Sequence, residues 1–494
     1  MNSSSAHPMT ARLRSVLRRA RSRERTVGDH LYSGYLGVLV VLVVAAPAVR
    51  AVWVLLVDPA VLPMRAAAQV SAVSAAGLLA VGLALIIGAT AGPAARTPLL
   101  TAILADSPFS RVGAFGGPVL RACAAGGAII GVAAAAWAWP LVSAGELPLV
   151  PAIAWTVVGV FLGATAGVSA LAGQRFPRAA PLIGAALISA AVGIGFVPAP
   201  PLASAGSDLW MATIAVAAVV AIVALITIPA LLNSLHSAAL VSTAQRRESA
   251  IDGAVMLDTA MVADVTRGLP YSGRRRRAVT GAPGWSGLPL RFLRRDVVGW
   301  TRTPGRLVVA AVGLACAAVL GMFALSLPGM GWLAVPGAVI IYAAAGPFTD
   351  GVRLAAEASD APALYGASPL ALLALHLLAP AAVLLAAVVV TGALVIAGIV
   401  AVTGILGVAM LGAAAIAARV ADARKPPLPV AMLAPIVTPF GDMAAANRVV
   451  WTLGPVLATA AVGLTATIPL LSAAIFAAVV LHAASRWRTA RLRR

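Results

Sequence analysis

Two short polar segments of similar sequence interrupt an otherwise apolar chain, and they carry the side chains best suited to chemistry. The first contains Asp106 and Pro108, and the second contains Asp360 and Pro362 in the same Asp-x-Pro order. A carboxylate on an exposed loop can accept charge-assisted hydrogen bonds from a partner protein. We therefore expect these segments to bind a partner, and neither has the composition of a catalytic centre.

Further charged side chains surround both Asp-x-Pro motifs. The first segment, Gly92 to Arg121, also contains Arg96 and Arg111, and the second, Gly346 to Pro369, also contains Arg353 and Glu357. The spacing of Arg353 and Glu357 is that of an ordinary i,i+4 ion pair on a helix. We expect both segments to be loops between membrane spans. Each begins with a Gly-Pro pair, Gly92-Pro93 and Gly346-Pro347, where the preceding span should end because proline cannot continue the hydrogen-bond ladder.

Several classes of site are excluded or disfavoured by the residues present. The chain has no Gly-x-x-x-x-Gly-Lys-Ser/Thr motif, and its only lysine is Lys425, so it is not a conventional P-loop ATPase. Cys123 and Cys316 lie in apolar runs far from a third ligand, which predicts neither a disulfide framework nor a zinc site. We expect no catalytic residue, bound cofactor or metal in this chain.

The composition is that of an integral membrane protein. Hydrophobic residues make up 61% of the 494 residues and charged residues 11%. A bilayer core about 30 Å thick requires roughly 20 apolar residues per helix, and runs of this kind cover nearly the whole chain. We predict an all-α protein of about twelve transmembrane helices, arranged as a tandem 6+6 repeat, with one span boundary at Thr391-Gly392.

The distribution of basic residues predicts the orientation. With the amino terminus inside, all but Arg50 and Arg65 of the 36 basic residues fall in the termini or in inner loops. We therefore expect a multi-pass protein of the plasma (cytoplasmic) membrane with both termini cytoplasmic. The net charge of +20 is then explained by contact with anionic headgroups rather than by nucleic-acid binding.

These predictions divide the chain into five parts. Residues 1–35 form a basic cytoplasmic segment and residues 36–235 the first six-span half. Residues 236–287 form a cytoplasmic linker, residues 288–485 the second half and residues 486–494 a basic tail.

An amphipathic basic segment precedes each half. The first contains Arg18 and Arg19 beside apolar residues, and the second contains Arg294, Arg295 and Trp300, with Leu290, Leu293, Val297 and Trp300 along one helical stripe. Such a helix lies in the interface with its arginines at the headgroups. We predict an interfacial elbow helix before each half.

This layout resembles the membrane subunits of ABC-2 type exporters, and also a family of actinobacterial multi-span membrane proteins of unknown function in which two halves are fused. The residues that carry the resemblance are Phe292 to Asp296, Thr303 to Arg306, Asp106 to Pro108, and Gly117 to Arg121. The resemblance implies a permease subunit of an exporter that is energised by ATP through separate ABC ATPase subunits. These would contact the two Asp-x-Pro segments, and the apolar spans favour an amphipathic or lipid-like substrate.

Two alternatives remain open. An ion-coupled secondary transporter with 6+6 spans would need a buried ionisable site, but the predicted spans contain no Asp, Glu or Lys, and His376 and His482 are expected at helix termini in the interface. A non-transporting accessory subunit of a membrane complex would explain the same composition. A membrane enzyme is disfavoured because the acids of the predicted outer loops, Asp58, Glu146 and Asp208, are scattered singly.

Overall fold

The computed structural model describes residues 71–195, 206–255, 272, 275, 287–326, 331–359, 368–396, 402–425, 437–438, 441–442, 444–466 and 468–492. The first predicted elbow, with Arg18 and Arg19, lies outside the described residues. The Asp360 and Pro362 pair does so as well, as do the predicted first span and Arg50 and Arg65.

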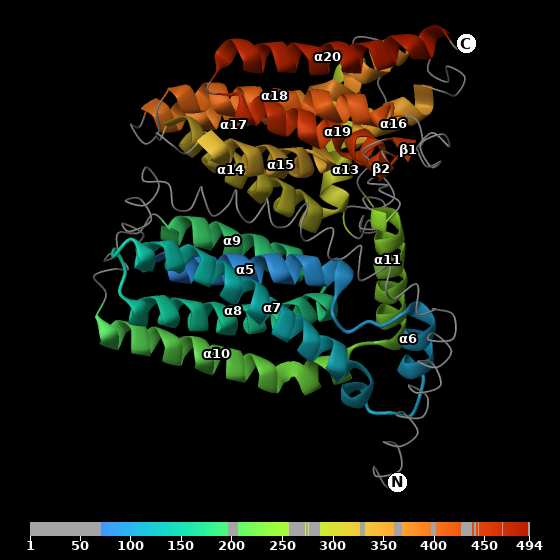
Figure 1. The fold of residues 1–494 in the computed structure, drawn as a ribbon. Coiled ribbons are helices and arrows are strands. Elements are labelled where there is room, and N and C mark those ends of the chain that lie inside the picture. The colour runs from blue at the N-terminus through green and yellow to red at the C-terminus, as the bar shows by residue number, and fades with distance from the viewer. Residues whose placement is uncertain are drawn as a thin grey trace.

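Helices account for almost all of the described chain (Figure 1). Up to the linker they are α5 (Ser71–Ala91), α6 (Pro98–Ala105), α7 (Arg111–Ser143), α8 (Leu149–Arg175), α9 (Ala180–Gly195), α10 (Ser207–Ser234) and α11 (Ser237–Val255). Helix α5 ends directly before Gly92-Pro93, as predicted, because proline cannot continue the hydrogen-bond ladder.

The second half of the chain begins with α13 (Leu288–Arg302), α14 (Pro304–Ser326), the 3-10 turn η4 (Gly331–Leu333) and α15 (Ala334–Ala344). It continues with the 3-10 turn η5 (Pro347–Thr349), α16 (Asp350–Ser359), α17 (Pro369–Ile396), α18 (Thr403–Ala423), α19 (Ala444–Leu464) and α20 (Pro469–Leu492). A hairpin of two short strands, β1 (Val437–Thr438) and β2 (Gly441–Asp442), precedes α19.

Eight helices of the described chain are long and apolar enough to cross a membrane: α5, α7, α8, α10, α14, α17, α18 and α20. The number rises to nine if the segments Gly331–Ala344 and Pro347–Ser359, which meet at a bend of 46°, form one span. Helix α9 has 16 residues and α15 has 11, fewer than the roughly 20 that a bilayer requires. The protein is therefore a multi-pass, all-helical membrane protein, and twelve spans remain a prediction.

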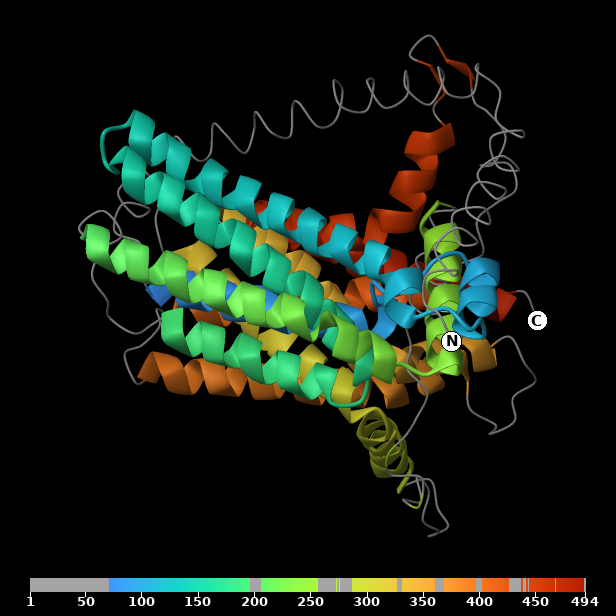
Figure 2. The same cartoon turned by 90° about the horizontal axis from the view of Figure 1, so that it is seen from below.

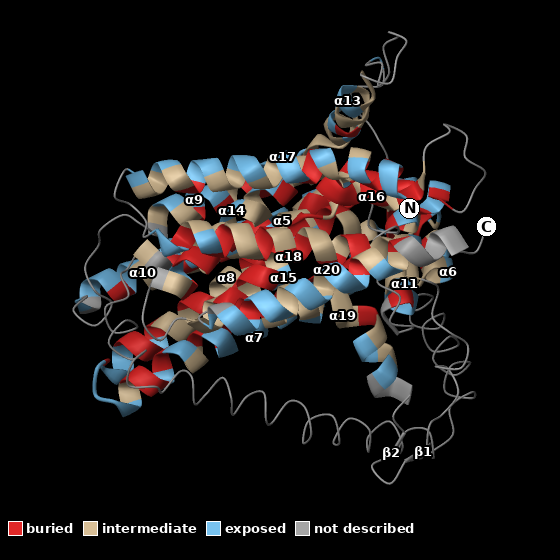
Figure 3. Cartoon of the chain, turned by 90° about the horizontal axis from the view of Figure 1, so that it is seen from above, coloured by how far each residue is buried: buried red, intermediate tan, exposed pale blue. Residues whose placement is uncertain are grey.

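The helices form two layers that meet where α9 packs against α14 (Figure 1). In the first layer α8 contacts α5, α7 and α10, and in the second α18 contacts α14, α15, α17 and α20. Buried residues concentrate along these contacts, whereas exposed positions line the outer faces of α17, α20 and α7 (Figure 3). Exposed apolar faces are expected where helices face lipid rather than water.

Glycines bring α7 and α8 into close contact. A Cβ atom on Gly163 would lie 2.1 Å from the carbonyl oxygen of Gly126, and one on Gly167 would lie 2.6 Å from the Cα of Cys123. Between helices in lipid there is little hydrophobic driving force, so close backbone contact at small residues contributes much of the association. The α7–α8 pair is therefore fixed by the absence of side chains at these positions.

Most of the charged residues lie at one end of the bundle, which we call the basic end. The short helices α6 and α16 lie there together with α11 and the carboxyl end of α20 (Figures 1 and 2). At the opposite end, the described residues contain only two ionisable side chains, Glu146 and Asp208. The described basic residues are thus on one side of the bundle, and the orientation of that side stays a prediction.

Two expectations about the connections are wrong. The segments predicted as loops contain helices: α6 and the first turns of α7 occupy the first segment, and η5 and α16 occupy the second. Helix α17 continues through Thr391-Gly392 to Ile396, because one glycine does not end a helix that is otherwise rich in strong formers. The linker also begins with an ordered helix, α11, whose Leu240 is buried.

The α7–α8 contact yields a test of the packing. We expect Gly163→Ala to lower the thermal unfolding temperature of the detergent-purified protein, because the new Cβ would meet the Gly126 backbone and force the helices apart. The control is Gly117→Ala on α7, where a Cβ would meet nothing within 4 Å. Gly117→Ala should leave the unfolding temperature unchanged or raise it slightly, since alanine favours a helix by up to about 1 kcal/mol over glycine. Equal melting of both variants would contradict the packing argument.

Candidate functional site

The first candidate segment forms a small platform at the basic end. Helix α6 exposes Leu99, Ile103 and Asp106, with 71% and 48% exposure of the two apolar residues. Pro108 follows in an exposed turn. Leu99 and Ile103 are four residues apart and Ile103 and Asp106 three, so all three lie on one face of the helix. A short helix with an exposed apolar and acidic face suits contact with a partner protein.

The two arginines of this segment hold the platform in place. The Arg96 side chain donates from Nε and Nη2 to the carbonyl oxygen of Ala114, at 3.0 and 2.9 Å. Arg111 donates from Nη2 to Ser237 Oγ at 3.3 Å, and Ser237 donates to the carbonyl oxygen of Ala105 at 3.0 Å. Arg96 and Arg111 are therefore structural residues that join α6, α7 and α11, and they are not exposed docking groups.

A buried glutamine supports the same corner and was missed from the sequence. Gln174, 5% exposed at the end of α8, accepts from the amide of Ala94 at 3.0 Å and donates to its carbonyl at 3.4 Å. These bonds satisfy backbone groups of the Gly92-Pro93 turn that no helix can satisfy. A polar residue near the end of a long apolar helix was the only available signal.

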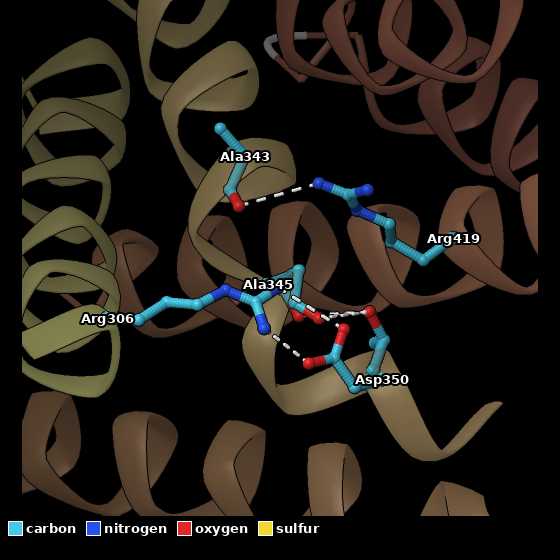
Figure 4. Close-up of polar contacts among 7 residues, drawn as sticks. Arg306, Ala343, Ala345, Asp350 and Arg419 are labelled. Carbon is cyan, nitrogen blue, oxygen red and sulfur yellow. Dashed lines mark hydrogen bonds and ion pairs between the residues drawn. The ribbon is translucent and has the colours of Figure 1, made fainter. Parts of the chain in front are cut away.

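The second segment is held by two ion pairs. Arg306 at the start of α14 binds Asp350 through both oxygens, with N–O distances of 2.5 and 3.2 Å (Figure 4). Arg353 and Glu357 form the predicted i,i+4 pair at 3.4 Å. Helix α16 buries Val352 and exposes Leu354 and Glu357. Its outer face thus combines apolar and acidic residues, as that of α6 does.

A buried ion pair joins the elbow helix to the bundle. His376 of α17 is 2% exposed, and its Nδ1 donates to the Asp296 carboxylate of α13 at 2.9 and 3.2 Å. The ring of Phe292 packs edge-on against His376, with centroids 4.9 Å apart. A Cβ atom on Gly351 would lie 2.4 Å from His376 Nδ1, so glycine is required beside the pair. His376 lies in the second turn of α17, near the helix end where the sequence expects it, and its ring is buried against Asp296 of α13.

The helix predicted before the second half is present as α13, but its faces differ from the predicted ones, and its place in the interface stays a prediction. Leu290 and Val297 of the predicted apolar stripe are 71% and 39% exposed, and Phe292 and Asp296 face the bundle instead. Arg294 is exposed, and Trp300 stacks edge-on against Phe348 at 5.1 Å. The helix projects across the direction of the spans (Figures 2 and 3). Its exposed apolar face suits lipid, and its inner face carries the ion pair.

A charged side chain also lies near the end of a candidate span. Arg419 of α18, placed by the sequence in an inner loop, donates to the carbonyl oxygen of Tyr342 at 2.7 and 3.0 Å and reaches that of Ala343 (Figure 4). Its guanidinium lies 3.9 Å from the centre of the Tyr342 ring, whose hydroxyl donates to Asp422 at 3.2 Å. These bonds satisfy the Tyr342 carbonyl, which has no backbone donor where α15 ends before Gly346-Pro347.

An apolar groove runs between α17, α18 and α20. Its volume is about 660 Å³, and every lining residue is apolar, including Leu384, Ala413 and Phe476. Trp487 closes the groove at the basic end, where the Arg424 guanidinium lies 5.6 Å from its ring centre. Arg424 also donates to Ser359 and to the Ala356 carbonyl of α16. The groove therefore begins next to α16 of the second segment.

No protein-family model, curated protein or solved structure matches this chain. Within the described residues, no group of three or more His, Cys, Asp or Glu side chains could hold a metal ion. The features that bear on function are therefore the helices α6 and α16 at the basic end and the apolar groove beside them.

The buried pair can be tested by removing one partner. We expect Asp296→Ala to lower the free energy of unfolding by about 1–3 kcal/mol, because it leaves a buried imidazole N–H without an acceptor. Thermal unfolding in detergent measures the effect. The control is Glu357→Gln, which breaks an exposed pair worth about 0.2–0.5 kcal/mol. If Asp296→Ala unfolds at the wild-type temperature, the pair does not anchor the elbow.

Proposed function

We propose that this protein is the membrane-spanning permease subunit of an ABC-type exporter, energised by a separate ATPase. One observation carries the proposal: the short helices α6, which follows α5, and α16, which follows α15, lie at the same end of the bundle. Both present an apolar and acidic outer face to the side where most charged residues gather. We assign this end to the cytoplasm of the plasma membrane because arginines and lysines near spans are retained there.

A 6+6 repeat is supported by the neighbours of corresponding helices. Alignment of the Asp-x-Pro motifs pairs α5 with α15, α7 with α17, α8 with α18, α9 with α19 and α10 with α20. The contacts α7–α8, α5–α8, α5–α9 and α8–α10 of the first half then correspond to α17–α18, α15–α18, α15–α19 and α18–α20 of the second. Two halves with the same packing suit a body that opens a path between them.

A lipid-like or amphipathic substrate is supported by the groove between α17, α18 and α20. A binding site for a small charged solute needs polar groups that fix its orientation, whereas this groove is lined by apolar side chains alone. Its end at Trp487 lies beside Arg424 and α16. A substrate in the groove would therefore lie close to the helix that we assign to ATPase contact.

A proton-coupled transporter is the second candidate, and the Asp296–His376 pair favours it. Ionisable groups buried in membrane helices often mark coupling sites. The pair joins two elements at 2.9 Å and is shielded from water. It lies near the start of α17 at the basic end, however, where it also serves as an anchor for α13. An accessory subunit would need neither this pair nor the groove.

The docking proposal predicts a partner that depends on both platforms. We expect the tagged protein, purified in mild detergent from its native host, to retain an ATPase with Walker motifs. The combined change Ile103→Asp and Glu357→Lys should reduce that ATPase at least about tenfold by quantitative mass spectrometry. Ile103→Asp removes an exposed apolar side chain from α6, and Glu357→Lys reverses the charge of an exposed residue on α16.

The matched control is Glu146→Lys, a charge reversal at the opposite end of the bundle. It should leave the ATPase bound. Asp106→Asn combined with Asp360→Asn tests the two motif acids in the same assay. A pure chain without ATPase activity would contradict the exporter proposal and favour the proton-coupled alternative.

A further inference from the structure

A pocket of about 330 Å³ lies at the basic end, between the elbow helix α13, the start of α14 and the η5–α16 segment. Four arginines line it: Arg295, Arg302, Arg306 and Arg353. Three acids line it as well: Asp296, Asp350 and Glu357. The volume is at the lower end of the range for small-molecule sites, which is about 300–1,000 Å³.

The three acids are already bound to cationic or donor side chains. Asp350 binds Arg306, Glu357 binds Arg353, and Asp296 accepts from His376. Arg295 and Arg302 form no ion pair with any described residue, and the Nε atom of Arg302 is buried without a hydrogen-bond partner. The pocket therefore contains two positive charges and a buried N–H donor that no side chain in the described part of the chain satisfies.

Buried donors of this kind call for an anionic acceptor. An unsatisfied buried polar group costs free energy, and a planar guanidinium matches the oxygens of a phosphate through two parallel hydrogen bonds. Arg295 and Arg302 are seven residues apart on α13, so both side chains lie on one face of that helix. The two guanidinium groups can thus approach one phosphate from the same wall.

The position of the pocket indicates where that phosphate comes from. The outer face of α13 exposes Leu290 and Val297, which belong in the apolar part of the interface. Leu307 and Leu354 also line the pocket, so its walls are not polar throughout. We propose that this pocket binds the phosphate group of an anionic membrane lipid through Arg295 and Arg302. The pocket shares Leu354 and Glu357 of α16 with the proposed ATPase contact, but the two arginines that would hold the phosphate lie on α13.

The test uses the full-length protein in mild detergent and three probes: phosphatidic acid, diacylglycerol and glycerol 3-phosphate. Native mass spectrometry measures the fraction bound at increasing probe concentration. We expect saturable binding of phosphatidic acid and none of diacylglycerol, which lacks the phosphate. The combined change Arg295→Gln and Arg302→Gln should weaken phosphatidic acid binding roughly ten- to a hundredfold, since it removes charge-assisted hydrogen bonds.

Arg291→Gln is the matched control, because Arg291 lies one turn before Arg295 on the same helix and does not line the pocket. It should leave binding within about twofold. Arg302→Lys keeps the charge but loses the paired donors, and an intermediate loss is expected from this better-tolerated change. Thermal unfolding of each variant identifies any loss that comes from misfolding.

The outcomes separate the sources of the phosphate. Binding of phosphatidic acid that excess glycerol 3-phosphate does not displace supports a lipid site, and displacement at similar concentrations supports a phosphate site filled from solution. Equal loss in Arg291→Gln, or no loss in both Arg302→Lys and the double variant, would overturn the proposal. Binding of diacylglycerol as strong as that of phosphatidic acid would overturn it too.

Discussion

The inability of a bilayer core to hydrogen-bond or solvate charge constrains the whole structure. It requires helices whose backbone groups are satisfied internally, and it moves ionisable side chains to the ends. Two charges are buried among the helices near the basic end, and each has a partner: Arg419 of α18 binds the Tyr342 carbonyl at the end of α15, and Asp296 of α13 binds His376. Without these contacts, the bend at Gly346-Pro347 and the seat of the elbow helix would leave polar groups unsatisfied in an apolar environment.

The same constraint explains how the helices associate. Apolar side chains gain little by leaving lipid for one another, so close contacts between small residues fix the geometry. In the first layer, Gly126 and Gly163 bring α7 and α8 together, and Gly82 and Gly184 do the same for α5 and α9. In the second layer, Gly351 makes room for the Asp296–His376 pair. Small residues thus determine both the packing of spans and the burial of charge.

The sequence predicted features that depend on local chemistry. The membrane class, the helix end before Gly92-Pro93, a helix over Leu288–Arg302 and the Arg353–Glu357 pair are all confirmed. Features that depend on distant residues were missed. Asp296 stands among arginines and resembles a surface residue, and only a histidine eighty positions later and a glycine at 351 explain its burial. The platforms α6 and α16 were missed because short helices of mixed composition resemble loops.

Helix α13 connects the features that the sequence left separate. Its inner face holds Asp296 against α17, and Arg295 and Arg302 line the pocket beside α16. A change in the position of α16 would therefore alter the pocket and press on the buried pair, because Gly351 lies in contact with both His376 and Asp296. A ligand shifts such an arrangement only if it binds one position of α16 more tightly than another. Because Arg295 and Arg302 both belong to α13, a bound phosphate would favour one position of α16 only through contacts with the α16 side of the pocket, where Arg353 and Leu354 lie.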